Sequence, residues 1–365
     1  MKQAYRIAAA AIGIVLGAGF LSGQELLRFF GAYGVWGYVG AVVAALFFYL
    51  TVTTVLFLAR ESGEITTDRI VLFFDAPLAR RAIASFEFIF LFLIYVLMIA
   101  ASGALLADVL ALPPLVGDLL FCVLTVFCSL FGVKGLVRVF SWLVPVLVVA
   151  TVAIAAGSIF YGGALVASDA EFSAGFLPAA LVYVSFNVVC AIPILAPVGK
   201  DAPSRASIRA GTAIATLLLT VIAVFILQAL SRGGVSDQSE LPMLVLSARL
   251  GGFAWGLYAF LLFGGIFSTG LSALTAINSY FTVRWQLSHG AVAVLATGLS
   301  LLGCSVALSG FRELVGFFYP VFGYIGLIPL VLLFLHAFLR KRRARRNESD
   351  SCGQQSAKRR KGEKE

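Results

Sequence analysis

The segment from Gly17 to Glu25, with the sequence GAGFLSGQE, combines glycines with an amide and a carboxylate inside an apolar stretch over residues 4–30. Lipid offers no hydrogen-bond partners, so a membrane helix must satisfy its backbone internally, and each glycine costs about 1 kcal/mol relative to alanine. An ionisable side chain at membrane depth indicates a functional site. The segment therefore predicts an interrupted helix that forms a binding site. The alternative is an intact helix whose glycines form a packing surface.

A second segment of this kind lies in the apolar stretch 175–198, which contains Ser185, Asn187 and Pro193. Pro193 lacks an amide hydrogen, and its ring clashes with the carbonyl four residues earlier, that of Val189. The side chains of Ser185 and Asn187 can bond to freed backbone groups. We therefore expect a second interrupted helix near Ser185–Asn187, with a simple proline kink as the alternative.

The stretch 252–283 contributes a pair of hydroxyls, Ser268 and Thr269. Hard cations take several oxygen ligands, and hydroxyls together with unwound backbone carbonyls would bind sodium without a buried charge. Hydroxyls in membrane helices usually bond back to their own turn. The pair therefore predicts a sodium site only if it faces an interrupted helix.

The elements that must position these residues are membrane helices. Hydrophobic residues make up 61% and charged residues 12% of the 365 residues, and the mean hydropathy is +1.00. A spanning helix needs about 20 apolar residues, and the apolar runs lack the alternation of porin strands. We predict an all-α polytopic membrane protein with ten transmembrane helices, over residues 4–30, 34–59, 83–108, 114–132, 138–162, 175–198, 206–230, 252–283, 289–309 and 313–339.

Motifs for catalysis or resident metals are not found in these stretches. They hold no HExxH, no paired aspartates and no Ser–His combination, and the five cysteines show no CxxC pair or metal spacing. We therefore expect neither an enzyme nor a cofactor, with sodium as the one possible bound ion.

Loop lengths predict an internal repeat. In each set of five spans the one long loop follows the second span, over residues 60–82 and 231–251, and each long loop holds a short apolar stretch. Because five is odd, the second set enters the membrane upside down, as in the inverted repeats of secondary transporters. We expect a transmembrane domain over 1–339, with repeat one at about 4–162 and repeat two at about 175–339. Coincidence of loop lengths is the alternative.

Charge predicts the orientation, since lysine and arginine are retained on the cytoplasmic side. With the N-terminus inside, only Arg28, Arg232, Arg249 and Arg312 of the 27 Lys and Arg residues fall outside. We expect a multi-pass protein of the cell membrane with both termini cytoplasmic. Residues 340–365 read as a disordered polybasic tail that contacts anionic lipid, so the net charge of +9 requires no nucleic-acid partner.

The run GAGFLSGQE followed by FF, together with the later YVSFN motif, resembles the YkvI-type bacterial membrane proteins, relatives of the amino acid–polyamine–organocation transporter superfamily. The resemblance covers nearly all of the ten-span region. It implies the leucine-transporter fold, which has two inverted five-helix repeats, interrupted helices one and six, and a site between helices one, three, six and eight.

The same resemblance implies roles for individual residues. Gly13 and Leu16 would offer carbonyls to a sodium ion, with Gly265, Ser268 and Thr269 from helix eight. Arg28 and Glu313 would form a gating ion pair. The substrate would contact Gly17, Ala18, Gly19, Ser22, Gln24, Glu25, Tyr95, Tyr183, Ser185, Phe186, Asn187 and Ser272. Gln24 and Glu25 depart from amino acid carriers of the superfamily, which usually have no acid there.

These features predict a secondary active transporter of a small amino-acid-like or amine solute, working by alternating access. Helix N-termini at the breaks would attract a carboxylate, whereas Glu25 would carry a proton or face a cationic amine. Sodium and protons both remain possible coupling ions. The alternatives are a ligand sensor on a transporter fold and, less favoured, an intramembrane enzyme. The oligomeric state stays open.

Overall fold

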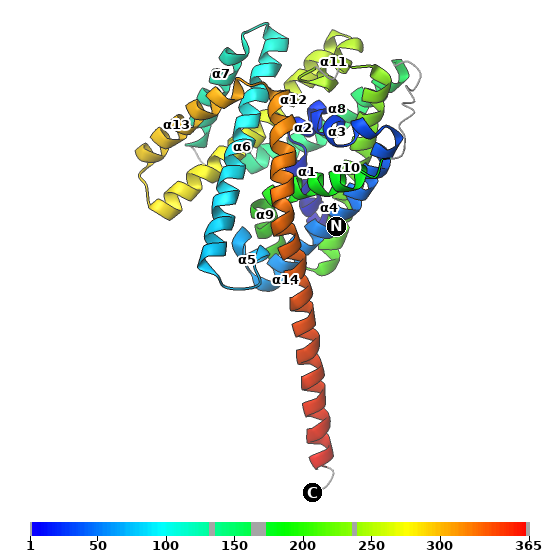
Figure 1. Ribbon diagram of the computed structural model, residues 1–365, viewed down its shortest axis with the longest axis vertical. Helices are drawn as coiled ribbons and strands as arrows, with labels where there is room; N and C mark the ends of the chain where they lie inside the picture. Colours follow the sequence, from blue (N-terminus) through cyan, green and yellow to red (C-terminus); the bar gives the residue numbers. More distant parts are fainter. Residues whose placement is uncertain (1, 131–135, 162–172, 236–238, 363–365) are drawn as a thin grey trace.

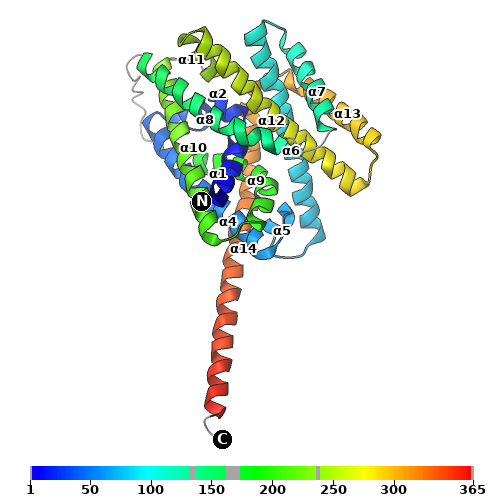
Figure 2. The same ribbon diagram turned by 180° about the vertical axis from the view of Figure 1, so that it is seen from behind.

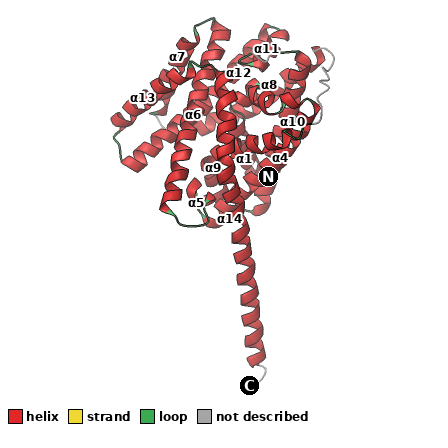
Figure 3. Cartoon of the chain, in the orientation of Figure 1, coloured by secondary structure: helices red, strands yellow, loops and turns green. Residues whose placement is uncertain are grey.

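The computed structural model describes residues 2–130, 136–161, 173–235 and 239–362, and every regular element in these ranges is helical (Figure 3). The long helices are α4 (Val35–Ser62), α6 (Pro77–Leu110), α7 (Pro114–Ser129), α8 (Leu136–Tyr161), α9 (Phe176–Lys200), α10 (Arg205–Gly233), α12 (Gly252–Trp285), α13 (His289–Ala307) and α14 (Phe311–Gly362). The predicted all-α class is confirmed for the described residues.

The first apolar stretch is broken into three helices, as the glycines predict. They are α1 (Lys2–Val15), α2 (Ala18–Ser22) and α3 (Gln24–Phe29), and a 3₁₀ turn over Gly31–Tyr33 follows. Gly17 is extended between α1 and α2, and Gly23 adopts a left-handed φ of 85° between α2 and α3. A side chain at Gly23 would be strained in that conformation. The interruption predicted between Gly17 and Gly23 is confirmed.

The sixth stretch behaves differently from the expectation. Helix α9 remains helical through Ser185–Asn187 and bends by 62° between Val189 and Ala191. The bend lies where the Pro193 ring displaces the Val189 carbonyl. The amide of Asn187 donates back to the Tyr183 carbonyl at 3.0 Å, so it supports its own helical turn instead of opening it. The sixth stretch is therefore bent as the proline predicts, but the break lies between Val189 and Ala191 and not at Ser185–Asn187.

Six of the described helices are long and apolar enough to cross a membrane, and the bent α9 gives a seventh. They are α4, α6, α10, α12, α13 and the first part of α14. The other predicted spans are interrupted, as in α1–α3, or short, as in α7 and the apolar part of α8. The protein is therefore a multi-spanning membrane protein, while the count of ten spans and the inverted repeat stay predictions.

The helices form two groups on either side of α14. Helices α1, α4, α9 and α10 pack closely together, and α6, α7, α12 and α13 form the second group. Figure 1 shows α7 and α13 at one side of the body and α10 at the other, and Figure 2 shows the same separation from behind. The broken stretch contacts both groups, because α1 packs on α9 and α10 while α2 packs on α12.

Two short helices lie in the long loops, α5 (Thr67–Val71) and α11 (Pro242–Arg249). They lie at opposite ends of the body (Figure 1). Helix α14 continues to Gly362 and leaves the body near α5. Residues 340–362 are thus helical where the sequence predicted a disordered tail. The reason is local, because this proline-free segment is rich in arginine and lysine, which favour helix.

Candidate functional site

The carboxyl group of Glu25 lies at the centre of the broken stretch. Its side chain is 2% exposed, and its Oε1 accepts a hydrogen bond of 2.7 Å from the hydroxyl of Tyr319 on α14. Its Oε2 is buried and has no hydrogen-bond partner in the described part of the chain. No lysine, arginine or histidine of the described residues forms an ion pair with it. The site therefore holds a buried acid whose charge is uncompensated.

Gly19 makes room for this pair of groups. A Cβ atom at Gly19 would lie 2.3 Å from Oε1 of Glu25 and 2.6 Å from the Tyr319 hydroxyl, closer than any real contact. The absence of a side chain therefore lets the α2 backbone lie directly against the carboxyl. This explains one of the glycines in the motif by close approach, whereas Gly23 is explained by its left-handed conformation.

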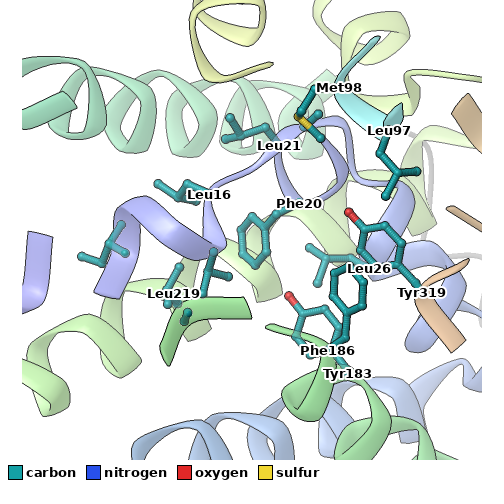
Figure 4. Close-up of a cluster of buried hydrophobic side chains, with 14 of the residues drawn as sticks. Leu16, Phe20, Leu21, Leu26, Leu97, Met98, Tyr183, Phe186, Leu219 and Tyr319 are labelled. Carbon is teal, nitrogen blue, oxygen red and sulfur yellow. The ribbon is translucent and has the colours of Figure 1, made fainter. Parts of the chain in front are cut away.

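Aromatic rings enclose the pair on the α9 side. The rings of Phe186 and Tyr319 stack with centroids 3.9 Å apart, and Tyr183 packs against Phe29 at 5.3 Å. Figure 4 shows Tyr183, Phe186 and Tyr319 close to Phe20, which lies with Leu21 in α2. The predicted site residues Gly19, Glu25, Tyr183 and Phe186 are thus brought together. Tyr319 was missed because nothing in its local sequence distinguishes it from the other aromatic residues of its span.

A pocket adjoins these rings between the broken stretch and helices α4, α9 and α10. Its walls include Val15, Phe20 and Leu26 from the broken stretch and Tyr183 and Asn187 from α9, with α4 and α10 closing it. The Tyr183 hydroxyl is buried and forms no hydrogen bond of standard geometry among the described residues. The walls are otherwise mainly apolar, which suits the hydrocarbon part of a small solute.

Helix α12 lies against the break, as the sodium hypothesis requires. A Cβ atom at Gly17 would lie 4.0 Å from Thr269 Oγ1, and one at Gly265 would lie 2.9 Å from the Leu21 side chain. Ser268 donates to the carbonyl of Gly265 at 3.0 Å, so it bonds back to its own turn. Gly13 lies in α1, and Leu16 directly follows that helix. The structure thus brings Thr269 beside the break, while ligation of sodium stays a prediction.

Gln24 is turned away from the pocket. Its amide donates to the backbone carbonyls of Ser239 and Glu240, in the latter case at 3.1 Å. The Glu240 carboxylate in turn accepts from the backbone N–H of Arg312 at 2.7 Å, at the start of α14. Burial raises the pKa of Glu240 more than the Arg312 amide lowers it. Gln24 therefore fastens the loop before α11 over the end of the body opposite the tail.

The gating ion pair expected between Arg28 and Glu313 is not formed. Arg28 donates to the carbonyl of Gly316 at 3.2 Å, whereas Glu313 pairs with its neighbour Arg312 at 2.9 Å. Both residues still lie near the first turns of α14. Arg312, adjacent in sequence, pairs with the exposed Glu313 carboxylate instead, and a gating role of Arg28 and Glu313 stays a prediction.

Tyr95 and the remaining polar candidates lie in other surroundings. The Tyr95 hydroxyl bonds to Thr125 on α7 and Ser300 on α13, each at 2.8 Å, so it joins the second helix group. The α6 residues that lie near the break are Leu97 and Met98 (Figure 4). Ser22 donates to the Gly19 carbonyl at 3.2 Å. The Ser185 hydroxyl faces Gly326 on α14, and Ser272 is half-buried on α12.

A further contact, between α2 and α12, was not predicted from the sequence. The hydroxyl of Tyr258, which is 1% exposed on α12, donates to the carbonyl of Leu21. This carbonyl belongs to the short helix α2, whose last carbonyls lack partners in the helix. Tyr258 therefore helps to hold α2 against α12.

Solved structures of similar fold are transporters. A nucleobase-cation-symport-1 family transporter, in a closed conformation with bromovinylhydantoin bound, matches at a TM-score of 0.58 with 13% identity, over 85% of this chain and 73% of that one. The manganese transporter of Eremococcus coleocola, in complex with an aromatic bis-isothiourea substituted compound, matches at 0.52 with 14% identity, over 92% and 85%. The interrupted helix and the enclosed acid thus occur in a membrane protein with a transporter fold.

Two curated proteins of Bacillus subtilis strain 168 are similar in sequence. The uncharacterized membrane protein YkvI is 24% identical over 350 residues, covering 94% of this chain and 97% of the relative. The uncharacterized protein YyaD is 25% identical over 333 residues, covering 90% and 96%. No protein-family model matches the chain. The chain is thus similar over nearly its whole length to YkvI and YyaD, and its fold is similar to that of the two solved transporters.

Proposed function

We propose that this protein is a secondary active transporter that moves a small amine or amino-acid-like solute across the cell membrane by alternating access. The observation that carries the proposal is the Glu25 carboxyl, which is buried at a broken membrane helix and forms no ion pair with a cation of the described residues. A buried ionised carboxylate without a partner costs several kcal/mol. A protonated amine, or a proton, would supply the missing charge.

The geometry around the break supports such a site. The pocket beside Phe20 and Tyr183 has mainly apolar walls, which suits an apolar substituent on the amine. The unwound backbone between α1 and α2 and the bend of α9 are discontinuities of the kind that secondary transporters use for solute and ion binding. In this proposal the ten spans form two inverted repeats, and both termini face the cytoplasm.

The coupling ion is sodium or a proton, and each alternative gives the ion-binding role to different residues. Sodium would use the carbonyls of Gly13 and Leu16 with the hydroxyls of Ser268 and Thr269, and the nearness of Thr269 to Gly17 favours this scheme. Proton coupling would use Glu25 itself. The transporter neighbours support a transport protein and leave both schemes in place.

Uptake by the purified protein in proteoliposomes tests the proposal. Labelled small amines and amino acids are supplied with an imposed sodium gradient, an imposed proton gradient, or neither. We expect gradient-dependent accumulation that is lost in Glu25→Gln and kept in Glu64→Gln, which changes an exposed carboxylate paired with Arg69. Thr269→Ala should abolish the stimulation of uptake by the sodium gradient and leave the stimulation by the proton gradient unchanged. Solute binding without uptake under any gradient would instead identify a ligand sensor.

A further inference from the structure

A second pocket lies between α5, α6, α9 and α14, near the end of the body from which the tail helix leaves. Its walls include Thr67 of α5, Phe86, Glu87 and Phe90 of α6, Val189 at the bend of α9 and Pro329 of α14. Figure 1 places α5 beside α14 at that end. The space accepts roughly one water-sized guest. It is therefore too small for an organic solute and large enough for a small ion.

The polar side chains of this pocket are those of Thr67 and Glu87. Thr67 is 3% exposed, and its hydroxyl forms no hydrogen bond of standard geometry in the described part of the chain. The Glu87 carboxyl lies within interaction range of that hydroxyl and forms no ion pair with any described residue. A buried hydroxyl without a partner costs free energy, so the pair is suited to a guest that both oxygens can bind.

The surrounding charge favours a positive guest. Arg80, a cation at the start of α6, is held at 3.1 Å by each of Asp68 and Asp75, and Asp68 adds negative potential at Glu87. The rings of Phe86 and Phe90 line the same pocket, and aromatic faces attract small cations. The site thus offers a carboxylate, a hydroxyl and two rings to one small ion.

Aromatic side chains separate this pocket from Glu25. Phe90 packs against Phe186 at 5.0 Å and against Phe322 at 5.4 Å, and Phe186 stacks on Tyr319, which holds the Glu25 carboxyl. The two acids therefore lie on opposite sides of one aromatic layer. From this arrangement we infer that Glu87 and Thr67 form a binding subsite for a small monovalent cation, distinct from the site at Glu25.

Equilibrium binding of labelled sodium to the purified full-length protein tests the inference. It is measured in the unmodified protein and in the Glu25→Gln, Thr269→Ala double variant, which disables the proposed site at the break. Unlabelled ammonium and choline serve as competitors at constant ionic strength. Choline is too large for the pocket and should not compete, while competition by ammonium identifies a subsite that accepts either cation.

We expect Glu87→Gln to weaken sodium binding in the double-variant background by about tenfold or more, because a charged ligand is lost. Thr67→Val should weaken it by a smaller factor, and the exposed control Glu64→Gln should leave it unchanged. If Glu87→Gln does not fold, the sodium affinity of Thr67→Val decides whether the inference stands. Unaltered affinity in the folded variants, or no sodium binding to the unmodified protein, overturns the inference. Binding is measured without transport, so this outcome is independent of whether uptake is found.

Discussion

The hydrogen bond between Tyr319 and Glu25 gives the most direct test of the site. Tyr319→Phe removes only the hydroxyl that donates to Oε1 at 2.7 Å and keeps the ring that stacks on Phe186. Since Oε2 forms no hydrogen bond of standard geometry with the described residues, the variant removes the one such bond that the buried carboxyl accepts. We therefore expect a clear loss of stability.

The size of the loss reports the state of the carboxyl. A net hydrogen bond to a charged group is worth about 1.5–3 kcal/mol, and one between neutral groups is worth about 1 kcal/mol. Glu25→Leu removes the acceptor at similar volume, so a double-mutant cycle with Tyr319→Phe isolates the pair from other effects of each change. A coupling energy near 2 kcal/mol would indicate an ionised carboxylate, and one near 1 kcal/mol a neutral acid.

Unfolding by SDS titration in mixed micelles provides the free energies for the four proteins of the cycle. Tyr324→Phe is a matched control, because this tyrosine is on the same helix and is 59% exposed, and it should change stability by less than about 0.5 kcal/mol. A coupling energy below about 0.5 kcal/mol would refute the view that Tyr319 is the residue that holds Glu25.

Three other changes probe the surroundings. Gly19→Ala would place a Cβ atom 2.3 Å from the Glu25 carboxyl, so it should destabilise the protein by about 1–3 kcal/mol through overpacking; an unaltered melting temperature would contradict this contact. Gln24→Leu removes the amide that binds the loop before α11. We expect faster hydrogen exchange that is confined to α11. Exchange equal to that of the unmodified protein would count against a role of Gln24 in holding this loop. Burial raises the pKa of Glu240, so ionising it costs more in the folded protein. Its contribution to stability is full below the ordinary glutamate range and is lost as pH rises through the raised pKa. The melting temperature of Glu240→Gln relative to the unmodified protein should therefore rise across that window, and a constant difference would disprove it.

The sequence predicted those features that depend on local backbone physics. Glycines weaken a helix wherever they stand, so the interruption between Gly17 and Gly23 could be located before any packing was known. Pro193 likewise acts on its own preceding turn and marked the bend of α9. The polar residues Ser185 and Asn187 misled the prediction, because a hydrogen-bonding side chain can stabilise its own turn as readily as it can stabilise a break.

Contacts between distant helices could not be predicted in the same way. Whether Tyr95 or Leu97 of α6 faces the break depends on the rotation of that helix about its axis, and an all-apolar helix has no polar face that reveals it. The same uncertainty hid Tyr319 and Tyr258, which only the packing of α14 and α12 brings to α2 and Glu25. The acid at Glu87 was missed because its partner Thr67 lies in a loop helix outside the spans.

The nearest cation in sequence to Glu25 shows why the site depends on a ligand. Arg28 lies three residues later, close to the same face of α3 by helical spacing, and could have balanced the buried acid. Its guanidinium instead points along α14 to the Gly316 carbonyl, and its side chain is exposed. No other cation of the described residues forms an ion pair with Glu25, so in the proposed mechanism the charge that stabilises an ionised carboxylate there comes from outside the protein. A proton and a cationic amine both satisfy that requirement, and this shared requirement makes Glu25 the residue on which both coupling schemes converge.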